Sequence, residues 1–161
     1  MLRRFILAAV LVVVISPPCG ADWQYTKWGM TPAEVLAASK GAARATTEEE
    51  KQGGRLRPSG QEPVLVAPWK SEQFEFTAKF YFSKEGERLN FVYLRLVSGS
   101  PDALLGDLKA KYSKALLSDE GEFLVHVVWH SGKDQVSYLA LGKDVVLISY
   151  QQLSDANNHG L

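Results

Sequence analysis

The chain has 161 residues, of which 46% are hydrophobic and 22% are charged, with 18 basic and 18 acidic side chains. This balance excludes the basic excess that is typical of proteins that bind nucleic acid or anionic membranes. A single cysteine also excludes an intramolecular disulfide.

The N-terminus has the layout of a secretory signal peptide. Two arginines precede an unbroken apolar run at residues 5–15, and three small residues precede Asp22. The run is shorter than the roughly 20 residues that a membrane-spanning helix needs. We therefore predict a signal peptide at residues 1–21, cleaved after Ala21, and a periplasmic or extracellular mature protein with no stable membrane span.

Cys19 leaves a second possibility open, which is lipidation at a bacterial lipobox. The two prolines directly before this cysteine depart from the lipobox pattern, so signal cleavage after Ala21 is the preferred interpretation. The mature chain would then contain no cysteine, and its 16 basic and 18 acidic side chains would give a net charge of about −2. Its length suffices for one domain, which we place at residues 22–153.

Residues 28–35, Trp-Gly-Met-Thr-Pro-Ala-Glu-Val, predict the start of a helix. Thr31 is a suitable N-cap, a proline occupies the first helical position, and the Glu34 side chain can reach back to the Thr31 amide. Gly41 predicts the end of this helix. Before it, residues 22–28 alternate weakly and predict a short edge strand.

Residues 44–63 differ in composition from the segments on either side. They contain three consecutive glutamates and several glycines and prolines, which predicts a long polar loop. A connection of about 20 residues is unusual inside a compact domain and is often functional. Two alternatives remain open, a solvated loop that can include one short helical turn, and a lid or partner-binding loop.

The remainder of the chain predicts six strands and a second helix. Pro68 ends the first strand, and the strand that follows alternates four phenylalanines and an alanine with polar residues. The expected strands are residues 64–67, 74–83, 89–97, 123–130, 135–141 and 145–151, the helix is residues 100–113, and residues 154–161 form a frayed tail.

One helix followed by three strands occurs twice in this order, which suggests an internal duplication. Consecutive strands joined by short turns are antiparallel. The expected fold is therefore α+β and two-layered, with two helices on one face of a mainly antiparallel sheet of about six strands.

The helix start at residues 28–35 resembles the W-G-M-S/T-x-x-E-V opening of small exported bacterial proteins of unassigned activity. Residues 108–115 resemble their L-x-x-K-Y-G-x-P helix end, with serine and alanine here in place of glycine and proline. Trp129 and Tyr150 stand where such proteins carry a tryptophan and a tyrosine in later strands. The order of elements is also similar to the group that contains beta-lactamase inhibitor protein and the small lipoprotein of the outer-membrane assembly machinery. The resemblance implies a fold and carries over no functional residues.

No motif predicts catalysis, a cofactor or a metal. His126 and His130 are four residues apart, which on a strand separates them by about 13 Å, too far to share a zinc ion. Asp134 and Asp144 belong to predicted turns. We therefore predict no catalytic, cofactor-binding or metal-binding residue and no enzymatic activity. An unrecognised enzyme, with a site assembled from distant positions, stays as an alternative.

The predicted strands carry more apolar side chains than two helices can cover, and a monomer rarely exposes a large apolar patch. An exposed tryptophan in a polar neighbourhood is also typical of an interface anchor. We predict an envelope protein that binds another protein through this sheet face, or alternatively a carrier of a small apolar ligand. The expected contact residues are Trp69, Leu94, Leu96 and Val128, with Leu124 and Ile148 on the same strand faces.

Overall fold

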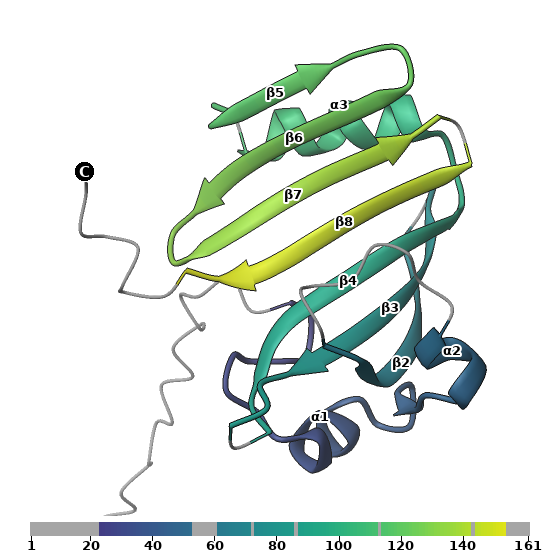
Figure 1. Cartoon of the computed structure of the whole chain (residues 1–161), viewed down its shortest axis with the longest axis vertical. Helices are drawn as coiled ribbons and strands as arrows, with labels where there is room; N and C mark the ends of the chain where they lie inside the picture. Colours follow the sequence, from purple (N-terminus) through teal and green to yellow (C-terminus); the bar gives the residue numbers. More distant parts are fainter. Residues whose placement is uncertain are drawn as a thin grey trace, which may run out of the picture.

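The computed structural model in Figure 1 describes residues 23–52, 61–71, 73–85, 87–112, 114–142 and 144–153. The signal peptide predicted at residues 1–21, the centre of the predicted 44–63 loop and the tail predicted at residues 154–161 lie outside these ranges. Among the described residues, no helix has both the length and the apolar character needed to cross a membrane.

Eight strands form one sheet in which every neighbouring pair is antiparallel, in the order β1-β2-β3-β4-β8-β7-β6-β5. The α+β class with an antiparallel sheet is thus confirmed, but the prediction of about six strands is wrong. The strands are β1 (Arg44–Ala45), β2 (Pro63–Lys70), β3 (Glu75–Phe82), β4 (Leu89–Ser98), β5 (Leu117–Glu120), β6 (Leu124–Ser131), β7 (Asp134–Leu141) and β8 (Val145–Gln152).

The two strands that the sequence did not predict lie at the two edges of the sheet. β1 is only two residues long, and all four residues of β5 are exposed, so neither strand has a periodic apolar pattern. β2 also runs past Pro68, where we expected it to end. Because β1 pairs only with Leu65 and Val66, β2 is itself an edge at Pro68, where a missing N–H is tolerated.

Three helices accompany the sheet, which corrects the expected two. They are α1 (Pro32–Ala38), α2 (Glu48–Gln52) and α3 (Pro101–Tyr112). α3 lies against β6 and buries Leu104 and Leu108, and α1 buries Val35 in the same core. α2 lies near β2 and buries none of its residues.

The N-cap of α1 has the geometry that the sequence predicts. The Glu34 amide donates to the Thr31 hydroxyl at 3.3 Å, and the Thr31 amide donates to the Glu34 carboxylate at 2.7 Å. The Thr31 amide and the Thr31 hydroxyl both donate to the Glu34 carboxylate, and these hydrogen bonds lower the pKa of Glu34. The helix ends at Ala38, and Gly41 follows with φ +91°, a conformation that glycine adopts without strain.

The segment predicted as an edge strand at residues 22–28 is instead irregular where it is described. Trp23 lies edge-on against Phe80 of β3 at a centroid distance of 5.4 Å, and the indole N–H of Trp28 donates to Asp134 at 2.6 Å. These aromatic contacts therefore hold the segment against β3 and β7, which are distant from it in sequence.

The two faces of the sheet differ in what covers them. We call the face toward α3 the core face, because the buried residues of β6 and β7, such as Trp129 and Tyr138, lie on it together with Leu104 and Leu108. The Tyr138 hydroxyl reaches the carbonyl of Pro101 at the start of α3. We call the other face the open face, and in Figure 1 β5–β8 lie in front of α3 with this face toward the viewer.

Candidate functional site

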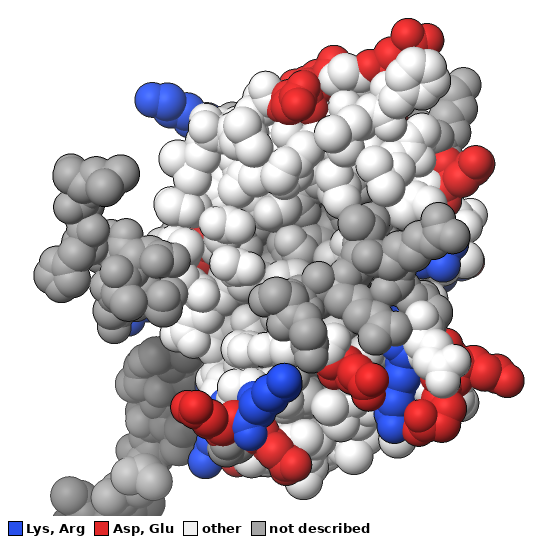
Figure 2. Space-filling view, in the orientation of Figure 1, with Lys and Arg blue, Asp and Glu red and all other residues white. Residues whose placement is uncertain are grey.

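The open face of β6, β7 and β8 has no charged side chain. Alternation along each strand and the pairing register assign twelve residues to it, and none is Lys, Arg, Asp or Glu. Figure 2 shows a broad uncharged area over these strands with acidic side chains above it, at the β5 edge. The twelve residues are Leu124, His126, Val128, His130, Gln135, Ser137, Leu139, Leu141, Val145, Leu147, Ser149 and Gln151. Leu147, at the centre of β8, is nevertheless buried, with 6% of its surface exposed.

At the β5 side of the open face, three strands carry apolar side chains that we call the leucine patch, with His126 and Asp119 lying between its two ends. It consists of Leu117, Leu124, Val128, Leu139 and Leu141. Leu117 is paired with Val128, and Leu124 with Leu141. Leu117, Leu124 and Leu141 remain 47%, 40% and 39% exposed, so no described part of the chain covers them. Phe123, at the adjoining turn, is 78% exposed and extends the apolar surface.

Tight turns hold the strands of the open face in register. Gly132 and Gly142 have φ values of +63° and +59° in the β6–β7 and β7–β8 connections, where an L side chain would be strained. β6 and β7 then pair without interruption from Leu124–Leu141 to Ser131–Asp134. The leucine patch is therefore built on a rigid hairpin.

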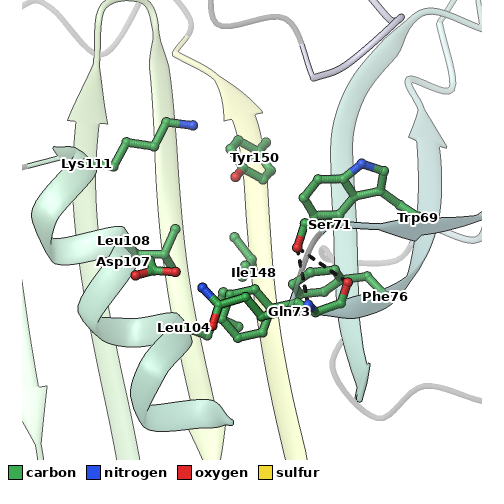
Figure 3. A pocket seen from close by; sticks show the side chains of 11 residues that line it. Trp69, Ser71, Gln73, Phe76, Leu104, Asp107, Leu108, Lys111, Ile148 and Tyr150 are labelled. Carbon is green, nitrogen blue, oxygen red and sulfur yellow. Dashed lines mark hydrogen bonds between the residues drawn. The ribbon is translucent and has the colours of Figure 1, made fainter. Parts of the chain in front are cut away.

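A second concave feature lies on the core face, between α3 and the β2–β3 turn. This groove has a volume of about 300 Å³. Figure 3 shows α3 on one side, Trp69 and Phe76 on the other, and Ile148 and Tyr150 at the back. Its lining residues are Trp69, Ser71, Gln73, Phe74, Phe76, Leu104, Asp107, Leu108, Lys111, Ile148 and Tyr150.

Aromatic contacts order one wall of the groove. Trp69 stacks on Phe76 with centroids 4.9 Å apart and an interplanar angle of 26°. At the back, burial and the neighbouring Tyr112 hydroxyl raise the pKa of Tyr150, so the Tyr150 hydroxyl keeps its proton at neutral pH. The Lys111 ammonium lies 5.0 Å from the centre of the Tyr112 ring, which holds it near the rim by a cation–π contact.

The four predicted contact residues do not form one surface. Leu94 is 1% exposed on the core face, and Leu96 is half-buried on the same face. Trp69 is half-buried in the groove and contacts Trp23, so it is not the isolated exposed anchor that we expected. Only Val128 lies on the open face. β4 is apolar on both faces, so the sequence pattern could not show which face other elements cover.

The remaining predicted positions also divide between the faces. Ile148 is buried on the core face, whereas Leu124 lies in the leucine patch. Leu117, Leu139 and Leu141, which complete the patch, were not predicted. For Leu139 and Leu141, the sequence signal is that β7 carries apolar residues at both alternating sets of positions, whereas Leu117 lies on the unpredicted β5.

The histidines and aspartates considered as candidate site residues lie in the strands and turns of the sheet. His126 and His130 both belong to the open face of β6, and the described residues contain no group of three metal-ligating side chains. Asp134, expected in a turn, begins β7 and is 1% exposed beneath the Trp28 indole. Asp144 is exposed in the β7–β8 turn.

No family model and no curated protein matches the chain. Among solved structures, it is similar to the crystal structure of a DUF4309 family protein, YjgB, from Bacillus subtilis subsp. subtilis str. 168. The identity is 13%, the TM-score is 0.40, and the similarity covers 76% of this chain and 78% of that one.

Proposed function

We propose that this protein is an exported, non-enzymatic module that binds a partner protein through its open sheet face. The observation that carries the proposal is that three adjacent strands present a face without charge, one side of which carries partly exposed leucines. Monomeric proteins rarely expose large apolar patches, and such patches commonly mark interaction sites.

The size of the open face suits a small, reversible interface. Strands of eight residues are about 26 Å long and the four-residue β5 is about 13 Å long, which at about 4.8 Å per strand gives about 440 Å² for β5–β8. Two such surfaces bury about 900 Å² in total, which is below the roughly 1,200–2,000 Å² of stable specific complexes. We therefore expect a transient complex rather than an obligate one.

The charges beside the leucine patch define the chemistry of the partner. β5 and its turn carry the exposed Asp119 and Glu122, and Asp119 lies opposite His126 on the open face, whereas Glu120 lies on the core face and pairs with Lys109 at 2.7 Å. Figure 2 shows acidic side chains along the upper border of the uncharged area. The best complement is an apolar surface that has Lys or Arg along the side that meets β5.

A matched pair of substitutions tests the proposal. Leu124 and Val64 are both 40% exposed, but Val64 lies on β2, across the sheet from the leucine patch. Leu124→Lys would place an ammonium group inside the proposed interface and should weaken partner binding at least about tenfold. Val64→Lys should leave binding unchanged.

The measurement is site-specific photo-crosslinking in the living host cell. A photoreactive residue at Ser137 should give one discrete product, which is lost in the Leu124→Lys background and kept in the Val64→Lys background. The crosslinked peptide of the partner should be apolar and flanked by Lys or Arg. The same photoreactive residue at Ala110, on the exposed side of α3, is the control and should give no product. Equal products from both positions, or a product of twice the mass of this chain, would contradict the proposal.

A further inference from the structure

The groove beside α3 is a second candidate site, because it opens on the core face and shares no residue with the leucine patch. Its walls differ in kind. One wall is aromatic, from the stacked Trp69 and Phe76, and the opposite wall is aliphatic, from Leu104 and Leu108 of α3. A slot with these two walls favours a flat apolar group.

The volume limits the size of what can bind. At about 30 Å³ for each water in the liquid, 300 Å³ corresponds to about ten waters. This space accommodates a single ring system but not a two-chain lipid, and it lies at the small end of the range for ligand pockets.

The charges at the rim select among small apolar groups. Asp107 and Lys111 lie one turn apart on α3 and both line the groove. Asp107 disfavours an anionic amphiphile, and Lys111 disfavours a cationic one. A peptide backbone offers an N–H to the acid and a carbonyl to the ammonium, so it complements both residues. Gln73 and Ser71 add uncharged polar groups on the opposite rim.

We propose that this groove binds the aromatic side chain of an extended, uncharged peptide segment, with the ring against the partly exposed Trp69 and Tyr150, over the buried Phe76 and Leu108, and the backbone across Asp107 and Lys111. The Tyr150 hydroxyl at the back of the slot supplies a hydrogen bond for a polar ring atom, such as an indole nitrogen. The proposal does not depend on the function proposed for the open face.

The test uses blocked pentapeptides that differ only in the central residue. Acetyl-Gly-Ser-Trp-Ser-Gly-amide and its alanine counterpart are titrated into the purified, ¹⁵N-labelled protein, and amide and indole shifts are followed by NMR. The tryptophan peptide should bind with a dissociation constant of about 1 mM and shift Trp69, Leu108 and Tyr150. The alanine peptide should bind at least tenfold more weakly.

Variants and charged probes separate the proposed occupant from other apolar ligands. Asp107→Asn and Lys111→Met should each weaken the tryptophan peptide at least threefold, whereas Lys114→Met, outside the groove, should not. Indole-3-propionate and tryptamine should each bind more weakly than N-acetyl-tryptophan amide. Tighter binding of either charged probe, equal binding of the alanine peptide, or shifts confined to the open face would overturn the proposal.

Discussion

Thr31 shows how one side chain sets the point at which a helix begins. It exchanges two hydrogen bonds with Glu34, and the sequence pattern alone was sufficient to predict both. The residues that form such a cap are only three positions apart, so their contact does not depend on how the remainder of the chain folds.

Thr31→Ala should lower the free energy of unfolding by about 1 kcal/mol, because one amide of the first turn of α1 loses its acceptor. Urea denaturation followed by circular dichroism measures the change. Partner crosslinking from Ser137 should remain at the wild-type level, because Thr31 lies outside the open face. Lost crosslinking in a variant of unchanged stability would show that this helix start has a binding role.

Asp134 and Trp28 illustrate what a local pattern cannot predict. They are 106 positions apart, yet the indole N–H donates to the buried carboxylate at 2.6 Å. The sequence placed Asp134 in a turn because aspartate is common there. Its burial follows from the irregular N-terminal segment crossing the start of β7, and no periodicity encodes that contact.

At the scale of elements, α2 repeats the capping pattern inside a segment that was expected to be a loop. The Glu50 amide donates to the Thr47 hydroxyl at 3.3 Å, and the Thr47 amide donates to the Glu50 carboxylate at 2.9 Å. Glu50 also forms a two-pronged ion pair with Arg44 of β1, with both contacts at 2.8 Å. The sequence therefore contains the helix-start pattern Thr-x-x-Glu, but we predicted a loop because the segment is highly charged.

The Arg44 ion pair and the Thr47 amide lower the pKa of Glu50 from 4.5 to about 2. Because the folded state favours the carboxylate, its stabilising contribution is complete above about pH 4.5 and is lost as the pH falls toward 2. Glu50→Gln should therefore reduce the fall in stability between pH 5 and pH 3, as measured by urea midpoints. The neighbouring Glu49→Gln is the control and should follow the wild type. An unchanged pH dependence in Glu50→Gln would contradict the ion pair.

The strands were predictable to different extents for a common physical reason. β3, with phenylalanines on one face and polar residues on the other, and the β6–β7–β8 turns were located within one or two residues of their observed bounds. β5 was missed because an exposed edge strand with two acidic residues has no buried side to produce a pattern. Leu94 and Val128 were assigned to one surface because alternation identifies two faces without showing which is covered.

At the scale of the whole molecule, the predicted export implies that the signal peptide is cleaved from the chain. Purified from its host, the protein should begin at Asp22, because cleavage after Ala21 follows three small residues. N-terminal sequencing and intact mass measure this directly, and Ala21→Arg, which blocks the cleavage position, should leave a longer product. A mature chain that begins at an acylated Cys19 would establish the lipoprotein alternative instead.

The strand order has a two-fold pattern, because β1-β2-β3-β4 and β5-β6-β7-β8 run inward from opposite edges and meet where β4 pairs with β8. This arrangement fits the predicted duplication, in which each half begins with a helix. The predicted repeat had one helix and three strands. Each half of the structure has a fourth strand, which is the short strand at its edge.

The β4–β8 seam also determines the order in which the sheet can be completed. Within each half, successive strands from β2 to β4 and from β5 to β8 pair with their chain neighbours, so these contacts are local and form quickly. The seam, with partners from Phe91–Gln151 to Arg95–Leu147, joins strands separated by about a third of the chain. β8 follows the other seven strands, so the sheet stays in two parts until β8 is available to pair with β4. The chain therefore delays the closure of its own sheet until its last strand has been made.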